Sequence, residues 1–142
     1  MPIGDVITIK DLEGALKKQG VAVTEGCVVL LRTGHGQLWM KHNDIFSKGE
    51  PGLGMAAARW LCERKIVLVG SDTWATEVVP NPNADLAFVV HNELITKNGI
   101  YNHENLDFTE LLADRVYEFV YVFAPLRMKG ATGSPGHPIA IT

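Results

Sequence analysis

Histidine and acidic side chains are the groups of this 142-residue chain that could hold a metal ion or move a proton. A hydrolytic metal site needs three or four ligands, usually imidazole nitrogens and carboxylate oxygens, and one open position. The histidines are His35, His42, His91, His103 and His137. None of them forms an H-x-x-x-H or H-E-x-x-H pair, so no local spacing predicts a metal site.

His91 and Glu104 are the pair that the surrounding pattern could bring together. His91 lies in an apolar helical stretch, Phe-Val-Val-His-Asn-Glu-Leu-Ile, and Glu104 comes directly after a predicted strand. From this pattern alone, His91 is either a structural histidine or a ligand, and Glu104 is either a solvated carboxylate or a ligand. A helix that ends at Gly99 and a returning strand could bring these two side chains together.

Nucleophilic catalysis and nucleotide binding have little support in the sequence. Ser71 follows a predicted strand but lacks the G-x-S-x-G context of a nucleophile elbow. Ser134, in Gly-Ser-Pro-Gly, suits a turn. The sequence contains neither a G-x-x-x-x-G-K-[ST] loop nor a G-x-G-x-x-G motif after a strand, so nucleotide binding has no support.

Helices and strands that would position these residues alternate along the first half of the chain. A capped helix is predicted over residues 8–19, and the wholly apolar run 27–32 suits a strand covered on both faces. A second helix is predicted to start near Leu53, and residues 66–69 to form another buried strand. This order predicts an α/β core with some parallel pairing.

The second half of the chain continues with a predicted turn at residues 81–83 and a helix that ends at Gly99. Residues 116–123 alternate in side-chain type and are apolar on both faces, which predicts a central strand. The Gly- and Pro-rich residues 130–138 predict a loop, and residues 139–141 a short final strand.

Composition indicates one globular domain over residues 1–142, with 46% hydrophobic and 20% charged residues. A formal net charge of −3 gives no electrostatic case for nucleic acid. The absence of a long apolar run and of a signal-peptide pattern leads us to expect a cytoplasmic protein without a membrane partner. Cys27 and Cys62 lack C-x-x-C spacing, which predicts buried thiols in a reducing compartment.

A series of short motifs occurs in order along nearly the whole chain. They are GCVVLLRTG at 26–34, PGL at 51–53, AARWL at 57–61, VGSDT at 69–73, HNEL at 91–94, GI at 99–100, ENL at 104–106, APL at 124–126 and GATGSP at 130–135. This ordered set resembles the cyclase family of metal-dependent hydrolases, which includes kynurenine formamidase and isatin hydrolase.

The resemblance implies an α/β fold of layered mixed β-sheets flanked by helices, of the swivelling β/β/α type and incomplete at the N-terminus. It implies hydrolysis of a small amide, lactam or lactone, as in the arylformamidases and isatin hydrolases, and a place in tryptophan catabolism. It also implies a zinc or manganese ion in the complete enzyme. His91 and Glu104 match the family's C-terminal metal ligands, so we expect their side chains to lie within about 4–5 Å of each other, as two ligands of one ion permit. Asp72 matches a family position that we expect to be structural.

The family's N-terminal signature, H-x-G-T-H-x-D-x-P-x-H, supplies the other metal ligands and has no counterpart in residues 1–142. Because two ligands rarely hold a catalytic ion, we expect the chain alone to be inactive or incomplete, with or without a bound metal. His35 and His42, in a long loop predicted at residues 33–52, and His103 are the candidates to replace missing ligands. His103 is the poorer candidate, because neighbouring side chains on a strand point to opposite faces.

Three interpretations stay open: a fragment of a longer enzyme, a naturally truncated gene product, or a non-catalytic binding or oligomerisation module built on the same fold. The partner expected for an enzyme is a small-molecule substrate. We also expect a homo-oligomer, because half of a family domain would leave apolar sheet or helix surface uncovered.

Overall fold

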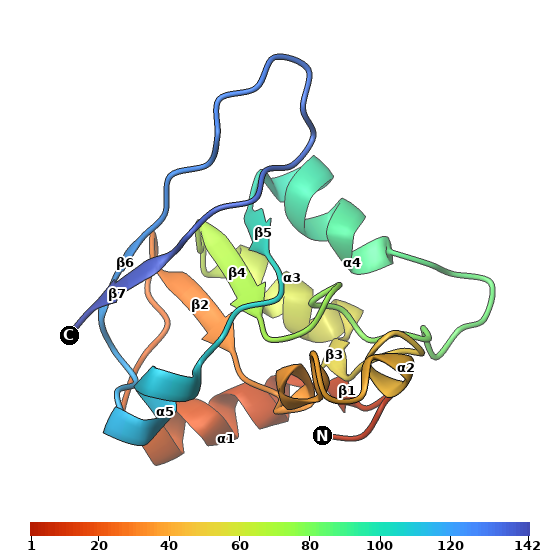
Figure 1. Ribbon diagram of the computed structural model, residues 1–142, viewed down its shortest axis with the longest axis horizontal. Helices are drawn as coiled ribbons and strands as arrows, with labels where there is room; N and C mark the ends of the chain where they lie inside the picture. The colour runs from red at the N-terminus through yellow and green to blue at the C-terminus, as the bar shows by residue number, and fades with distance from the viewer. The chain divides into compact units, whose positions relative to one another are not determined.

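Three parallel strands form the largest sheet of the chain, in the order β2 (Val28–Leu31), β4 (Leu68–Ser71) and β5 (Tyr101–His103) (Figure 1). Leu68 of the central strand pairs with Val28 on one side and with Tyr101 on the other. All four residues of β4 are buried, whereas those of β2 are only partly buried. The strand at residues 27–32 is therefore less covered than expected, because residues on both faces of β2 stay partly exposed.

The structure, a computed structural model, describes residues 1–142 as two compact units, Met1–Phe108 and Thr109–Thr142. In the first unit, β1 (Val6–Ile7) and β3 (Gly52–Leu53) form a second, two-stranded parallel sheet. The predicted first helix is present as α1 (Ile9–Gln19). Its Thr8 cap and the left-handed Gly20 after it, with φ of 72°, explain where the helix begins and ends.

Helices α1, α3 (Met55–Glu63) and α4 (Val89–His91) pack their apolar faces into one core with the sheets. The π-helical segment η2 (Asn92–Lys97) continues α4 directly. The buried side chains of this core include Ile7, Leu12, Leu53, Ala57, Leu61, Val69, Val90, Leu94 and Ile100. Because α4 and η2 contribute buried residues, the core fixes the helix that carries His91.

The long loop predicted at residues 33–52 contains two short helices, η1 (His35–Leu38) and α2 (Asn43–Phe46). Asp72 stabilises the first turn of this loop. The buried Asp72 carboxylate accepts hydrogen bonds from the backbone N–H of Thr33 and Gly34, both at 2.8 Å, and from the Thr33 hydroxyl at 2.7 Å. These bonds give Asp72 the structural role expected for it.

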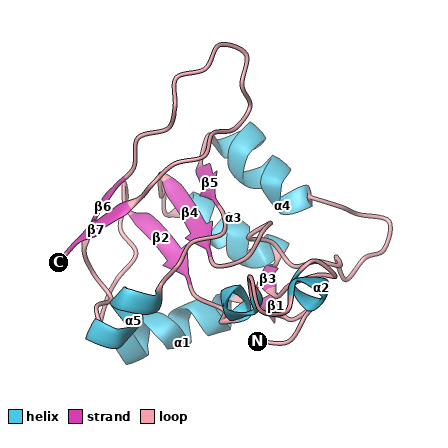
Figure 2. Ribbon diagram, in the orientation of Figure 1, coloured by secondary structure: helices cyan, strands magenta, loops and turns pink.

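The second unit consists of α5 (Thr109–Asp114) and a two-stranded antiparallel ribbon, β6 (Val120–Val122) with β7 (Ile139–Ile141). Figure 2 shows that most of the chain between the two strands is loop. The final strand is present as predicted. The prediction of a central strand at residues 116–123 is wrong, because only residues 120–122 form a strand and it pairs with β7 alone.

These elements make a mixed α/β fold, as the sequence predicted, with small parallel and antiparallel sheets. Both cysteines are free thiols and are partly buried. None of the helices has the length and apolar character that a membrane span requires.

Candidate metal centre

The side chains of His91 and Glu104 meet between the end of α4 and the end of β5. Nε2 of His91 lies 3.1 Å from Oε1 of Glu104. Gly99, with φ of 65°, turns the chain after η2 so that β5 runs back along the sheet. This is the turn that the sequence predicted, and it brings the two residues within the expected distance.

Glu77 forms a hydrogen bond with Nδ1, the other ring nitrogen of His91. Its carboxylate is almost fully buried, and its Oε1 lies 2.5 Å from Nδ1 of His91. The same carboxylate accepts the backbone N–H groups of Val90 at 3.2 Å and of His91 at 3.0 Å. Histidines that bind metals commonly donate their second ring N–H to a carboxylate, which fixes the tautomer and the ring orientation.

Hydrogen bonds to Glu104 and to Glu77 raise the pKa of His91 to about 9, although burial of the ring acts in the opposite direction. At neutral pH the imidazole is therefore positively charged when only protons compete for it. A divalent cation at Nε2 would take the place of one of these protons.

Asn102 on β5 completes the polar cluster. Its Nδ2 donates a hydrogen bond of 2.8 Å to Oε1 of Glu104 and lies 3.2 Å from Nε2 of His91. The side chain of Asn102 points the same way as that of Glu104 because the two residues are two positions apart in an extended segment. Asn102 was not among the candidate residues predicted from the sequence, although its spacing of two residues from Glu104 is a signal that could have identified it.

The other histidines do not join this cluster. His35 is buried, stacks on Phe46 and contacts the backbone carbonyl of Phe46 through Nε2 at 3.2 Å. His42 is exposed before α2, and His137 is exposed in the second unit. Burial lowers the pKa of His103, which precedes Glu104 on β5. Nowhere do three His, Cys, Asp or Glu side chains come together in an arrangement that could hold a metal ion.

The geometry of the His91–Glu104 pair fits a shared divalent ion. Two ligands at right angles, each about 2.0–2.2 Å from the ion, lie about 2.8–3.1 Å apart. The observed separation is 3.1 Å. One neutral imidazole nitrogen and one carboxylate oxygen are also donor types that zinc and manganese accept. These two donors alone are fewer than the three that catalytic sites usually have.

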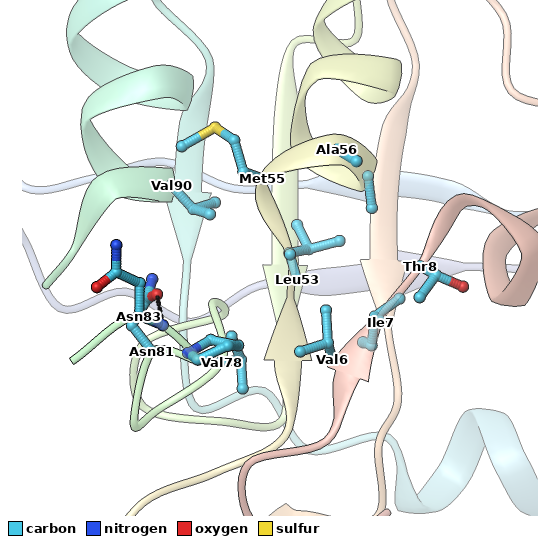
Figure 3. Close-up of a pocket in the computed structure, with 13 residues that line it drawn as sticks. Val6, Ile7, Thr8, Leu53, Met55, Ala56, Val78, Asn81, Asn83 and Val90 are labelled. Carbon is cyan, nitrogen blue, oxygen red and sulfur yellow. Dashed lines mark hydrogen bonds between the residues drawn. The ribbon is translucent and has the colours of Figure 1, made fainter. Parts of the chain in front are cut away.

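An apolar pocket of about 330 Å³ lies near the start of α4, at β1, β3 and α3 (Figure 3). Its wall includes Val6, Leu53, Met55, Val78 and Val90. None of the residues of the polar cluster lines it, so the pocket is separate from the candidate metal ligands.

Comparison with known proteins places the chain among cyclases. The model of the family described as "Putative cyclase" matches residues 2–78, a segment that ends before His91. A search of curated proteins found no match.

Solved structures match over nearly the whole chain. A protein described as a novel cyclase is 33% identical, with a TM-score of 0.88, and the match covers 100% of this chain and 49% of that one. Isatin hydrolase A from Labrenzia aggregata is 25% identical, with a TM-score of 0.76, and the match covers 99% and 56% of the two chains. A potential metal-dependent hydrolase with cyclase activity is 22% identical, with a TM-score of 0.68, and the match covers 97% and 59%. The chain therefore spans about half the length of the solved proteins it matches.

Proposed function

The chain belongs to the cyclase family, and on that premise we propose that it forms part of a metal-dependent hydrolase in which His91 and Glu104 bind the metal ion. The substrate class that we propose is a small amide, lactam or lactone. Similarity to an isatin hydrolase, an enzyme named for a lactam, supports this class.

The observation that carries the proposal is the position of the His91 ring. Its Nε2 lies 3.1 Å from Glu104 while its Nδ1 is held by the buried Glu77. A protonated structural histidine would donate to both carboxylates, whereas a metal ligand would keep Nδ1–H on Glu77 and turn Nε2 to the ion that Glu104 shares. The match of His91 and Glu104 to the family's C-terminal metal ligands favours the second role.

A divalent ion, when bound, would activate a water molecule and polarise the substrate carbonyl. Water adds to the acyl carbon, the C–N or C–O bond breaks, and the products are a carboxylic acid and an amine or alcohol. In this scheme His91 and Glu104 bind the cation, and Glu77 orients the imidazole and carries the charge that stabilises it. Either zinc or manganese would suit these donors.

We propose that the remaining groups of the active site come from polypeptide that corresponds to the other half of the matched structures. The test is a chimera in which the half of the novel cyclase that this chain does not span is joined to residues 1–142. Its hydrolysis of isatin, N-formylkynurenine and simple lactones would be measured with added manganese or zinc, beside the intact novel cyclase as the positive control.

The expected result is metal-dependent hydrolysis that falls more than about 100-fold in His91→Ala and Glu104→Ala chimeras, since both remove a proposed ligand. His137→Ala, which removes an exposed histidine of the second unit, should leave the rate unchanged. A folded chimera without turnover, beside an active novel cyclase, would contradict the proposal and favour a non-catalytic module.

A further inference from the structure

The side-chain amide of Asn102 faces the same point in space as His91 and Glu104. Its Nδ2 lies 3.2 Å from Nε2 of His91 and 2.8 Å from Oε1 of Glu104, and these two atoms are 3.1 Å apart. The three atoms form a nearly equilateral triangle. Three ligands of one ion at right angles would form a triangle with edges of about 2.8–3.1 Å, whereas tetrahedral ligands would lie about 3.3–3.6 Å apart.

The other end of the same amide is buried and has no partner. Oδ1 of Asn102 is the one buried side-chain oxygen or nitrogen that makes no hydrogen bond. Buried polar atoms are almost always paired, so this atom requires an explanation. A half-turn about the Cβ–Cγ bond exchanges the amide oxygen and nitrogen, which have nearly the same size and shape. The rotation brings Oδ1 to the third corner of the triangle. It also breaks the hydrogen bond from Nδ2 to Glu104 and turns the amide oxygen toward the carboxylate, an arrangement that a cation between the two oxygens would stabilise.

We propose that Asn102 is a third metal ligand, through its amide oxygen, so that this chain holds a divalent cation with three donors of its own. The inference rests on the proposed function of His91 and Glu104. One imidazole nitrogen and two oxygens at right angles suit an octahedral ion such as Mn²⁺. Asn102 thereby raises the number of donors from two to three without any His, Cys, Asp or Glu beyond the proposed pair.

Asn102 has one competing role, which is to donate an N–H to Glu104 and so to orient that ligand. Asn102→Asp tests the first role in one direction. An aspartate oxygen of the same reach that takes the place of a ligating amide oxygen tightens binding, so weaker binding would exclude the amide oxygen as a ligand. Tighter binding also follows from a new carboxylate beside Glu104, so the two roles are separated by the distance between the Asn102 oxygen and Mn²⁺ in a crystal of the wild-type chain.

The experiment is a titration of the full chain with Mn²⁺, followed by the electron paramagnetic resonance signal of the free ion. The variants are Asn102→Ala, Asn102→Asp and His91→Ala, with Asn92→Ala as the matched control because Asn92 is exposed on the next residue of the helix. Circular dichroism checks that each variant is folded. The smaller change, Asn102→Ala, carries the test even if Asn102→Asp loses its fold.

We expect one Mn²⁺ per chain, at least about tenfold weaker binding in Asn102→Ala and His91→Ala, about tenfold tighter binding in Asn102→Asp, and no change in Asn92→Ala. Unchanged affinity in Asn102→Ala, or weaker binding in Asn102→Asp, would overturn the role of Asn102. If His91→Ala still lost the ion in that case, the proposed ligand pair would stand. A wild-type chain that binds no Mn²⁺ would overturn the three-donor site, and the chimera assay would then judge the His91–Glu104 pair separately.

Discussion

Glu77 accepts two hydrogen bonds from His91, one from the backbone N–H at 3.0 Å and one from the ring Nδ1 at 2.5 Å. The first bond fixes the helical turn and the second fixes the orientation of the ring. Because the Glu77 side chain is only 2% exposed, the loop between β4 and α4 is tied to the helix at the residue that we propose to bind metal.

Replacement of Glu77 should destabilise the fold. Glu77→Ala leaves the N–H groups of Val90 and His91 and the His91 ring without their acceptor, and we expect the free energy of unfolding to fall by about 3 kcal/mol. Glu77→Gln keeps one acceptor oxygen and should cost about 1 kcal/mol. Urea denaturation measures both, with the exposed Glu63→Gln as the control. A Glu77→Ala variant as stable as that control would refute this role.

Glu50 should make stability depend on pH. Its carboxylate is fully buried and accepts the backbone N–H groups of Trp74 at 2.7 Å and Ala75 at 2.9 Å, and burial raises its pKa from 4.5 to about 7. Between these two values the folded state binds more protons than the unfolded state, so the free energy of unfolding falls as pH rises from 4.5 to 7. The total change expected from this group is about 3 kcal/mol.

Urea denaturation across that pH window checks the Glu50 prediction. Glu50→Gln should flatten the pH dependence, because an amide does not titrate there, whereas the exposed Glu13→Gln should keep it. The raised pKa of His91 adds a fall in stability only above its ordinary value of 6.5, so it contributes little to the window. Equal slopes in wild type and Glu50→Gln would contradict the assignment.

The ribbon of the second unit should mediate self-association. Val120 pairs with Ile141 and Val122 with Ile139, and all four side chains are exposed, with values of 62% for Val120 and 55% for Ile141. A two-stranded ribbon is marginally stable alone, and an apolar face of this kind favours burial against another surface. We therefore expect a homo-oligomer, and we expect Val122→Asp to shift it toward monomer.

Light scattering at high micromolar concentration measures this association. Ala140→Ser, at a position that pairs with Tyr121 instead of belonging to the four-residue face, should leave the oligomer intact. A monodisperse wild-type monomer would be evidence against the prediction.

The chain without a partner polypeptide should not be an efficient hydrolase. Even with zinc or manganese, we expect it to act on isatin, N-formylkynurenine or simple lactones no faster than its His91→Ala variant. The reason is that the family signature that supplies the other metal ligands has no counterpart in residues 1–142. Turnover by the wild-type chain that disappears in His91→Ala would show that the chain has enough groups of its own.

The local pattern of a helix, a turn at Gly99 and a returning strand made it possible for His91 and Glu104 to meet, and the family resemblance at both positions led us to expect it. Glu77 could not be predicted, since it lies in a loop without helices or strands and only tertiary packing buries it beside His91. Asn102 could have been predicted from its spacing to Glu104, because residues two positions apart in an extended segment share a face.

The predictions for residues 27–32 and 116–123 failed for a different reason. An apolar run indicates that side chains tend to be buried, but it does not say which strand neighbours or helices are there to cover them. In the structure both faces of β2 stay partly exposed, and β6 pairs with β7 alone. Sheet order depends on contacts between distant segments, which local periodicity does not encode.

The most direct test of metal binding by His91 and Glu104 is the position of Mn²⁺ in a crystal of the chain, located by the anomalous scattering of the ion. We predict one strong peak about 2.0–2.2 Å from both Nε2 of His91 and Oε1 of Glu104, with an oxygen of Asn102 at a similar distance. A peak at another place in the molecule, or no peak at saturating manganese, would contradict the binding of a metal ion by these side chains in this chain.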